Sequence, residues 1–335
     1  MKMKRLLAWL LVLVMCFTLA ACKPAVKNED TKPTETVATT PTTTPVEQSK
    51  NDGPSPLLYR VTDKSGHTIW LFGSIHVGRE SYYPLPEYVQ NAFDRADSLA
   101  VEMDIVAFEK DVNAQISALT ALVYRDGSKI SDHIPKDVYD QCVAILTEYN
   151  TYMPLLDMYG PAFWSSTIDG LLVEELGADA DLGIDKHLLD MAYKTDKEIL
   201  EVESAEFQYQ MLAGFDDEVQ IAVLESSIAN YHEKEAAKED LEKMMDIWAS
   251  GDEKAFADYL ATDDTGMTEE EKELYARYNK AMVTDRNLSM TQFAEAALSS
   301  GKEVFICVGA AHVVGQGAMA DLLAQRGYTV ECITK

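Results

Sequence analysis

The sequence predicts an α/β fold in which a mixed central sheet is flanked by helices and carries a large helical insertion. Over residues 57–335, short apolar or alternating runs typical of strands recur between longer helical stretches. The stretch from residue 105 to residue 194 is helical in pattern almost throughout, which predicts the insertion. No second linker-like tract interrupts residues 57–335, so we expect one folded domain there.

Two strands, a helix and a third strand are predicted at the start of this domain. Residues 57–61 and 68–72 have the β-branched and aromatic content of strands, and a Lys-Ser-Gly turn at 64–66 separates them. Residues 86–96 are helical in pattern. Residues 99–102 are a short apolar run, which predicts a buried strand.

The chain beyond the insertion continues the same alternation. Residues 198–202 are predicted as another buried strand, and several helices run to residue 299. The C-terminal stretch has the pattern of a β-α-β unit, with strands at 303–308 and 328–333 around a helix at 317–325. By analogy with lids elsewhere, we expect the helical insertion to shape access to a site on the sheet.

The first residues have the pattern of an export signal. Three basic residues precede an apolar run at residues 6–19, which is too short and wrongly flanked for a transmembrane helix. The ending Leu-Ala-Ala-Cys resembles a bacterial lipobox, in which Cys22 becomes the acylated first residue of the mature protein. We therefore expect a signal peptide at residues 1–21 and a lipid anchor at Cys22 on the extracytoplasmic face of the cell membrane.

Residues 22–56 differ sharply in composition from the rest of the chain. Thr, Pro, Lys, Glu and Asp dominate, and almost no large apolar side chain is present. Such a stretch cannot bury enough surface to offset the entropy of ordering it. The sequence therefore predicts a disordered tether at 22–56 and a folded domain at 57–335.

The charge balance excludes some partners, and the cysteine count excludes a disulfide framework. The chain has 29 Lys and Arg against 56 Asp and Glu, a net charge of −27. Removing the signal peptide with its three basic residues takes this to −30, which argues against nucleic acid and anionic lipid surfaces as partners. Of the three cysteines in the domain, Cys307 and Cys332 could pair if their strands are neighbours, but we favour buried free thiols.

Polar side chains follow four of the predicted strands, at the point where each strand ends. His76 and His312 each come three residues after a glycine, and Glu102 and Glu203 follow the other two strands. Because ligands of open α/β sheets bind outside the carboxyl ends of strands, we expect these four side chains to converge. Two imidazoles with one or two carboxylates suit Zn, Mn, Fe or Co, and such a metal could activate water. We interpret each glycine as the residue that lets the chain turn sharply as it leaves the sheet.

Other polar residues in the domain have more than one interpretation. Arg286 lies on an apolar helix face, so it either points into the core toward a carboxylate or bound anion, or extends from the stripe to solvent. Asp185 is interpreted as an N-terminal helix cap. The remaining histidines lack the strand-end pattern and are interpreted as surface residues; they are His67, His133, His187 and His232.

Several motifs in a fixed order resemble those of the TraB/GumN family, to which the Tiki proteases are related. The two GxxH motifs are GSIHV at 73–77 and VGAAH at 308–312. Between them stand VEMD (101–104), LGID (182–185), VESAEFQ (202–208) and DRN (285–287). The resemblance implies a metal-dependent hydrolase fold related to the erythromycin esterase and ChaN-like proteins. It makes His76, His312 and Glu102 the expected metal ligands, with Glu203 and Arg286 as neighbouring active-site residues. Small departures, Ser74 for threonine and VES for LET, remove no expected ligand.

Two functions are therefore expected as alternatives. The first is a surface-anchored, metal-dependent peptidase using Mn, Co or Zn, in which Glu102 completes the coordination or acts as general base and Arg286 binds a substrate carboxylate or developing oxyanion. The second is a non-catalytic protein that sequesters a peptide pheromone or haem. A dinucleotide site at Gly315-Gln316-Gly317 is rejected, because His312 occupies the loop that would have to hold the pyrophosphate.

Overall fold

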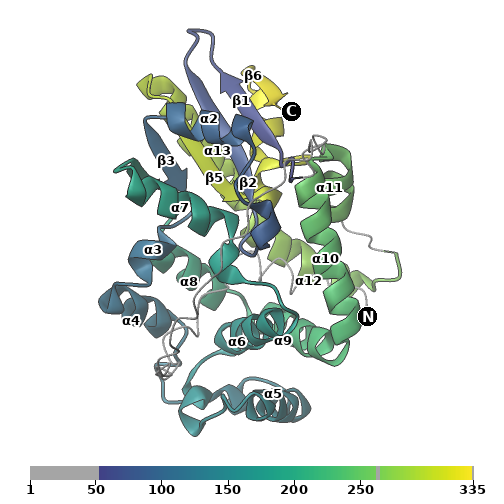
Figure 1. The fold of residues 1–335 in the computed structure, drawn as a ribbon. Helices are drawn as coiled ribbons and strands as arrows, with labels where there is room; N and C mark the ends of the chain where they lie inside the picture. Colours follow the sequence, from purple (N-terminus) through teal and green to yellow (C-terminus); the bar gives the residue numbers. More distant parts are fainter. Residues whose placement is uncertain (1–52, 262–264, 334–335) are drawn as a thin grey trace, which may run out of the picture.

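The computed structural model describes residues 53–261 and 265–333 (Figure 1). Within them, six strands form one mixed sheet in the order β4-β3-β5-β2-β1-β6, with helices on both faces, which confirms the predicted α/β class. The predicted signal peptide, Cys22 and most of the predicted tether lie outside the described residues.

Each predicted strand is confirmed to within two residues. The strands are Leu58–Thr62 (β1), Thr68–Ser74 (β2), Ser98–Val101 (β3), Glu198–Glu201 (β4), Val304–Gly309 (β5) and Thr329–Ile333 (β6). Strands β4, β3, β5 and β2 are mutually parallel, whereas β1 is antiparallel to both β2 and β6. The carboxyl ends of the four parallel strands therefore meet along one edge of the sheet.

The sheet order corrects one prediction and refines another. Strand β4 was expected to be buried, but it is an edge strand with both terminal residues exposed. The predicted C-terminal β-α-β unit is confirmed, since β6 runs parallel to β5, but the two strands are not neighbours because β2 and β1 lie between them. Since β2 and β1 separate β5 from β6, Cys307 and Cys332 do not pair; Cys307 is a buried thiol, and Cys332 is exposed rather than buried.

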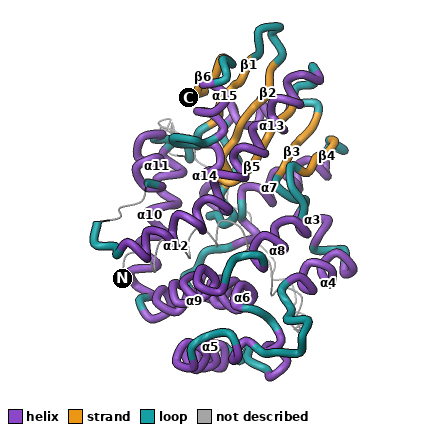
Figure 2. The backbone as a smooth tube through the Cα atoms, turned by 180° about the vertical axis from the view of Figure 1, so that it is seen from behind, coloured by secondary structure: helices purple, strands orange, loops and turns teal. Residues whose placement is uncertain are grey.

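Helices cover both faces of the sheet. Helices α2 (Glu87–Arg95) and α7 (Ile184–Lys194) lie on the face seen in Figure 1, and α13 (Asp285–Ser300) and α15 (Met319–Gln325) lie on the face seen in Figure 2. The short helix α14 (Ala310–Val313) follows β5 directly. Phe93 of α2 packs on Phe305 of β5 with 5.8 Å between ring centroids, which ties that helix to the centre of the sheet.

The other helices form a layer beyond the carboxyl edge of the strands (Figure 1). The predicted insertion is confirmed as mostly helical, and further helices follow β4. The bounds are Ile105–Phe108 (α3), Val112–Ala121 (α4), Lys136–Glu148 (α5), Pro161–Glu175 (α6), Ala205–Ala213 (α8), Asp217–His232 (α9), Lys234–Ser250 (α10), Glu253–Leu260 (α11) and Glu269–Asn279 (α12). A π-helical turn at Lys280–Thr284 joins α12 to α13.

The interface of α6 and α9 contains small polar side chains in addition to apolar ones. Asp169 of α6 is 3% exposed and accepts a hydrogen bond of 2.9 Å from the Ser227 hydroxyl of α9. Burial raises the pKa of Asp169 to about 8, and the Ser227 hydrogen bond only partly offsets this rise. The carboxyl is therefore largely protonated at neutral pH.

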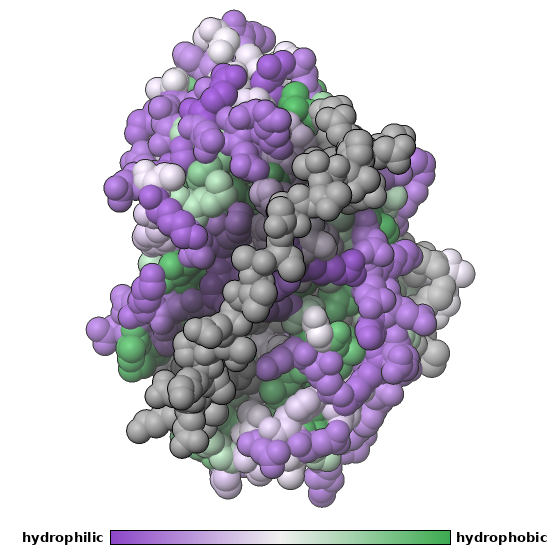
Figure 3. Space-filling view, viewed as in Figure 1, coloured by the Kyte–Doolittle hydropathy of each residue, from purple (hydrophilic) through white to green (hydrophobic). Residues whose placement is uncertain are grey.

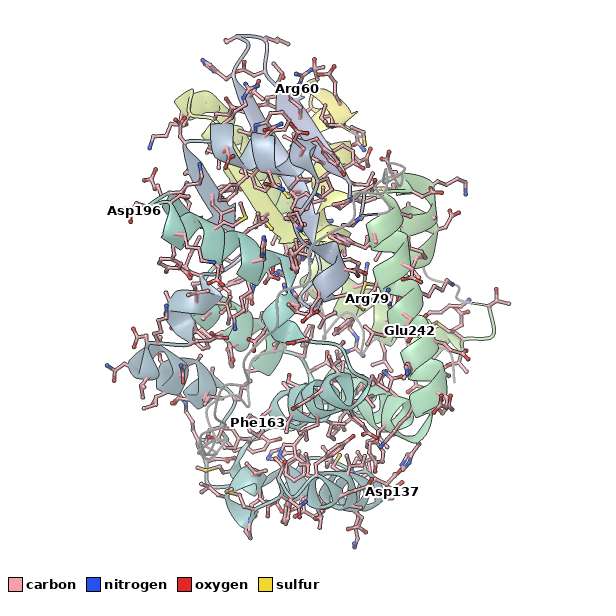
Figure 4. The ribbon with its side chains drawn as sticks, viewed as in Figure 1. Arg60, Arg79, Asp137, Phe163, Asp196 and Glu242 are labelled. Carbon is pink, nitrogen blue, oxygen red and sulfur yellow. The ribbon has the colours of Figure 1, made fainter. Side chains whose placement is uncertain are left out.

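Contacts at the ends of the sheet join it to the helical layer. The end of the predicted tether packs against the domain, where Ser55 donates a backbone hydrogen bond of 2.7 Å to Ala249. Arg79, in the loop after β2, pairs with Asp246 of α10 at 2.7 Å (Figure 4). The face in Figure 3 is mostly hydrophilic, in keeping with the acidic composition. In the part of the chain that the structure describes, no helix combines the length and apolar character needed to cross a membrane.

Candidate functional site

The residues predicted at the four strand ends lie close together in the structure. Glu102 directly follows β3, and Glu203 follows β4 by two residues. His76 lies in the loop after β2, and His312 lies in α14 after β5. All four side chains are buried, so their charges and hydrogen bonds are strongly coupled.

Glu102 is the centre of this cluster. Its Oε2 accepts hydrogen bonds from Arg286 Nη2 at 2.5 Å and from Gln208 Nε2 at 3.1 Å. Its Oε1 accepts one from the backbone N–H of Gly309 at 2.7 Å and lies 3.9 Å from His312 Nε2. Burial by itself would raise the pKa of Glu102, but the Arg286 charge lowers it to about 2 with help from the histidines and the Gly309 amide. The side chain is therefore a carboxylate at neutral pH.

Arg286 of α13 joins the two glutamates. It donates to both oxygens of Glu203, from Nε at 2.8 Å and from Nη2 at 2.7 Å, in addition to its bond to Glu102. With 1% of its surface exposed, it points into the core, so the alternative in which it extends to solvent is wrong. Its Nη1 donates to the carbonyl of Met282, which belongs to the π-helical turn before α13. That turn helps to hold the guanidinium against the glutamates.

His76 is oriented by an aspartate from α7. Its Nδ1 lies 2.9 Å from Asp185 Oδ2. The start of α7 is held there because the Ile184 N–H donates to the Ile75 carbonyl at 3.0 Å, and a Cβ on Gly183 would lie only 2.7 Å from the His76 carbonyl oxygen. The prediction that Asp185 is a helix cap is wrong, since Gly183 is the cap residue. Burial lowers the pKa of His76, but the charges of Asp185 and Glu102 outweigh it and raise the pKa overall.

His312 is oriented by an amide instead. Its Nδ1 lies 2.7 Å from Asn287 Oδ1, and the Asn287 amide nitrogen donates to the carbonyl of Gly317 at 2.9 Å. That second bond fixes the amide oxygen toward the imidazole, so Nδ1 is the protonated donor and Nε2 carries the lone pair. Burial and the Arg286 charge lower the pKa of His312 to about 3, which keeps the ring neutral at physiological pH.

Close packing explains the glycines of the two GxxH motifs. Gly73 lies inside β2, so its predicted role at a sharp turn is wrong, whereas Gly309 does stand where β5 turns into α14. Neither residue has a positive φ, so the backbone conformation alone does not demand glycine. A Cβ on Gly73 would lie 2.8 Å from Cα of Ala310, and one on Gly309 would lie 3.2 Å from Oε1 of Glu102. The missing side chains let β2 approach α14 and let the Gly309 amide reach Glu102.

A small cavity lies beside the cluster, lined by His76, Glu102, Asp185, Gln208 and the Cys307 thiol among others. It has a volume of about 20 Å³, enough for one water or ion. Burial raises the pKa of Cys307 well above its ordinary value, so the residue is a thiol and not a thiolate nucleophile.

The imidazole nitrogens and carboxylate oxygens of the cluster are donor types that suit a divalent metal, but their present positions do not form a metal site. Both imidazoles have Nδ1 held by a side-chain oxygen, the arrangement that orients metal-ligating histidines. His312 and Glu102 present nitrogen and oxygen donors 3.9 Å apart. Within residues 53–261 and 265–333, however, no three His, Cys, Asp or Glu side chains are grouped closely enough to hold a metal as they stand. A metal at His76, His312 and Glu102 would require these side chains to move closer together.

Three residues that complete the cluster were not assigned these roles from sequence. Asp185, Gln208 and Asn287 each contact one or more predicted site residues, and each is the last residue of a quoted motif, LGID, VESAEFQ or DRN. Their positions within these motifs were the available signal. Among the remaining histidines, His232 is exposed, whereas His187 is half-buried and stacks on Tyr83 at 4.1 Å, so the surface interpretation is too simple for it.

The fold and the cluster define an α/β protein with a buried histidine–carboxylate–arginine site at the carboxyl edge of its sheet. The chain belongs to the TraB/PrgY/gumN family, whose sequence model matches residues 57–332, which confirms the resemblance. It is 26% identical over 253 residues to the uncharacterized protein YbaP of Escherichia coli (strain K12), covering 76% of this chain and 86% of the relative. YbaP of Shigella flexneri gives the same values. No solved structure matches the chain.

Proposed function

We propose that the protein is a metal-dependent hydrolase whose reactive centre is formed by His76, His312 and Glu102. The observation that carries the proposal is the matched support of the two imidazoles, with Asp185 on Nδ1 of one and Asn287 on Nδ1 of the other. In this proposal, Nε2 of each ring is the coordinating atom. A divalent ion held there would supply Lewis acidity and a water of lowered pKa.

Glu102 serves as a ligand in this proposal rather than as the general base. An efficient base has a pKa near the operating pH, and a pKa of about 2 makes Glu102 a weak proton acceptor. A permanently ionised carboxylate is well suited to hold a cation. Arg286 keeps Glu102 ionised although the carboxyl group is buried.

Glu203 and Arg286 act as positioning residues. Arg286 is almost wholly buried, and its hydrogen bonds go to the two glutamates and to the Met282 carbonyl. That geometry argues against direct contact with a substrate carboxylate or oxyanion and favours a role in fixing Glu102. Glu203 helps to hold Arg286 in place. It accepts hydrogen bonds from the Arg286 guanidinium and, at 2.9 Å, from the Gln208 amide.

The substrate class in this proposal is a peptide, and the site of action is outside the cytoplasm. The peptide assignment follows from the resemblance to the Tiki branch, in which peptidase activity is found. The location follows from the signal pattern at residues 1–21 and the lipobox cysteine at position 22. Replacing Cys22 by Ala should release the protein from the membrane fraction; an unchanged distribution would contradict the anchor.

Hydrolysis is tested by incubating a mixed peptide library with the purified protein in Mn²⁺, Co²⁺ or Zn²⁺ and identifying products by mass spectrometry. His76→Ala and His312→Ala should each abolish cleavage, and His232→Ala, which changes an exposed histidine outside the site, should leave it unchanged. Cleavage that persists in both site variants would overturn the assignment. Metal-dependent retention of intact peptide without cleavage would instead support the binding alternative. A cavity of about 20 Å³ could not enclose a haem without a large rearrangement.

A further inference from the structure

A second pocket, whose lining residues are all different from those of the cluster, lies over the edge of the sheet formed by β1 and β6. Tyr59 and Cys332 are direct partners in the antiparallel β1–β6 ladder, so their side chains are on the same face of the sheet. Both line the pocket, as does Val330, two residues earlier on β6. The floor of the pocket is therefore the end of the sheet opposite to β4.

Three other segments form the walls. Helix α15 contributes Asp321, the loop before it contributes Gln316, and the first residue of α11 contributes Glu253. Figure 2 shows α11 and α15 on the same side of the molecule as β6. The volume of the pocket is about 470 Å³, within the range of small-molecule sites.

The glycine-rich loop that resembles a dinucleotide fingerprint is part of this pocket. Gly315 and Gly317 have φ values of 108° and 76°, a backbone conformation that favours glycine. The N–H of Gly317 donates to Asp321 Oδ2 at 2.7 Å, which holds the loop against the start of α15. The pocket is therefore lined by Gln316 and the Asp321 carboxylate, and the Gly317 N–H, which a phosphate would need, is already bonded to that carboxylate.

One polar group at the floor has its hydrogen-bonding capacity largely unused. Tyr59 is 3% exposed, and its hydroxyl makes no hydrogen bond of ordinary length and angle in the part of the chain that the structure describes. Burial raises the pKa of Tyr59, and the nearby Glu253 carboxylate raises it further through its charge and a weak hydrogen-bonding contact with the hydroxyl. A buried hydroxyl without a well-formed hydrogen bond costs free energy that a bound donor would recover.

We propose that this pocket binds a small organic cation with a primary ammonium group. Two carboxylates line it, and none of the described residues that line it is basic, so an anion would be repelled. An ammonium group has three N–H donors, so it can donate to the Tyr59 oxygen and to Glu253 at the same time. Ala320, Ala324 and Val330 provide apolar surface for the carbon chain. The described lining residues do not supply three grouped metal donors, which favours an ammonium over a metal ion.

The proposal is tested by a ligand-observed NMR titration of the purified protein with n-butylammonium, with n-butanol and butyrate as neutral and anionic matches. Saturable binding is expected for the cation alone. Glu253→Gln should weaken it about tenfold, because a charge-assisted hydrogen bond is lost. Tyr59→Phe, which removes only the hydroxyl, should weaken it several-fold.

Two control variants make the outcome decisive. Glu331→Gln removes an acid from the neighbouring position of β6. The Glu331 carboxylate pairs with Arg60 and is not part of the pocket lining, so this change should leave binding unchanged. His76→Ala, in the proposed hydrolytic centre, should also leave it unchanged, so the two proposals fail independently. No saturable binding, equal binding of n-butanol, or equal loss in Glu331→Gln and Glu253→Gln would overturn the proposal.

Discussion

Glu102 at the sheet edge and Asp169 between α6 and α9 are both buried carboxylic acids, yet they hold opposite charge states. Glu102 has a pKa of about 2 and Asp169 a pKa of about 8. Burial acts in the same direction on both, raising the pKa. The difference is that Glu102 faces Arg286 at 2.5 Å, whereas among the described residues Asp169 accepts its side-chain hydrogen bond from the neutral hydroxyl of Ser227. The partner, and not the depth of burial, decides which acid carries charge into the core.

The largest effect on stability is expected when Arg286, the cation beside Glu102, is removed. Arg286→Met would leave Glu102 and Glu203 buried without their counter-charge and should lower the free energy of unfolding by about 3–5 kcal/mol. Urea denaturation measures this loss. Arg277→Met, which breaks surface pairs with Asp216 and Glu218, is the control and should change stability little. Similar losses in the two variants would mean that the buried charges are not the main cause.

Asp169→Asn tests the raised pKa of the second acid through the pH dependence of stability. The folded state binds the Asp169 proton more tightly than the unfolded state, whose pKa is near the ordinary value of 3.8. This contribution to stability is fully present below about pH 4 and is lost as pH rises toward 8. Asp169→Asn should therefore be the more stable protein at pH 9 by a few kcal/mol, since each pKa unit corresponds to about 1.4 kcal/mol. Parallel pH profiles of thermal unfolding for the two proteins would contradict the raised pKa.

Asp185→Asn separates charge from orientation at His76. Asparagine keeps a hydrogen-bond acceptor but removes the negative charge, so the pKa of His76 in the metal-free protein should fall. Loss of this support should weaken Mn²⁺ binding by about 10- to 100-fold. NMR titration of the imidazole and calorimetry with Mn²⁺ measure the two effects. An unchanged His76 pKa would show that Asp185 is not its main electrostatic partner.

The smallest effects are expected at two glycines, one near each acid. Gly309→Ala would press a methyl group on Glu102 Oε1 and should destabilise the protein by about 1 kcal/mol. Gly170→Ala, next to Asp169 inside α6, meets nothing within 4 Å and should stabilise by about 0.5–1 kcal/mol. If thermal unfolding showed that both variants are stabilised or that both are destabilised, the contrast between a packed site and an open helix position would be contradicted.

The strand positions and the strand-end residues could be predicted from the sequence, because both depend on local pattern. Apolar runs located all six strands, and the rule for carboxyl ends brought His76, His312, Glu102 and Glu203 together. The order of the strands could not be obtained this way, since β6 pairs with β1 although Arg60 and its partner Glu331 are 271 positions apart in the sequence. That long-range pairing is also what separates Cys307 from Cys332.

The residues that support the predicted site residues were harder to predict, because their contacts also join distant parts of the sequence. Asp185 lies near the start of a helix, where capping residues are common. Its hydrogen bond to His76 depends on the close packing of Gly183 against the His76 carbonyl, which a local pattern does not show. Arg286 had two interpretations because a helical pattern shows which face is apolar but not what that face meets. The structure resolves it through the pairing with Glu102 and Glu203.

The central claim, that His76, His312 and Glu102 form one metal centre, is tested most directly by metal stoichiometry. Elemental analysis and calorimetry with Mn²⁺, Co²⁺ and Zn²⁺ would be made on the wild-type protein beside His76→Ala, His312→Ala and the control His232→Ala. We expect binding of one ion per protein in the wild type and in the control, and loss of that binding in both site variants with the fold retained by circular dichroism. Failure of the wild type to bind any of the three metals, or undiminished binding in both site variants, would contradict the claim.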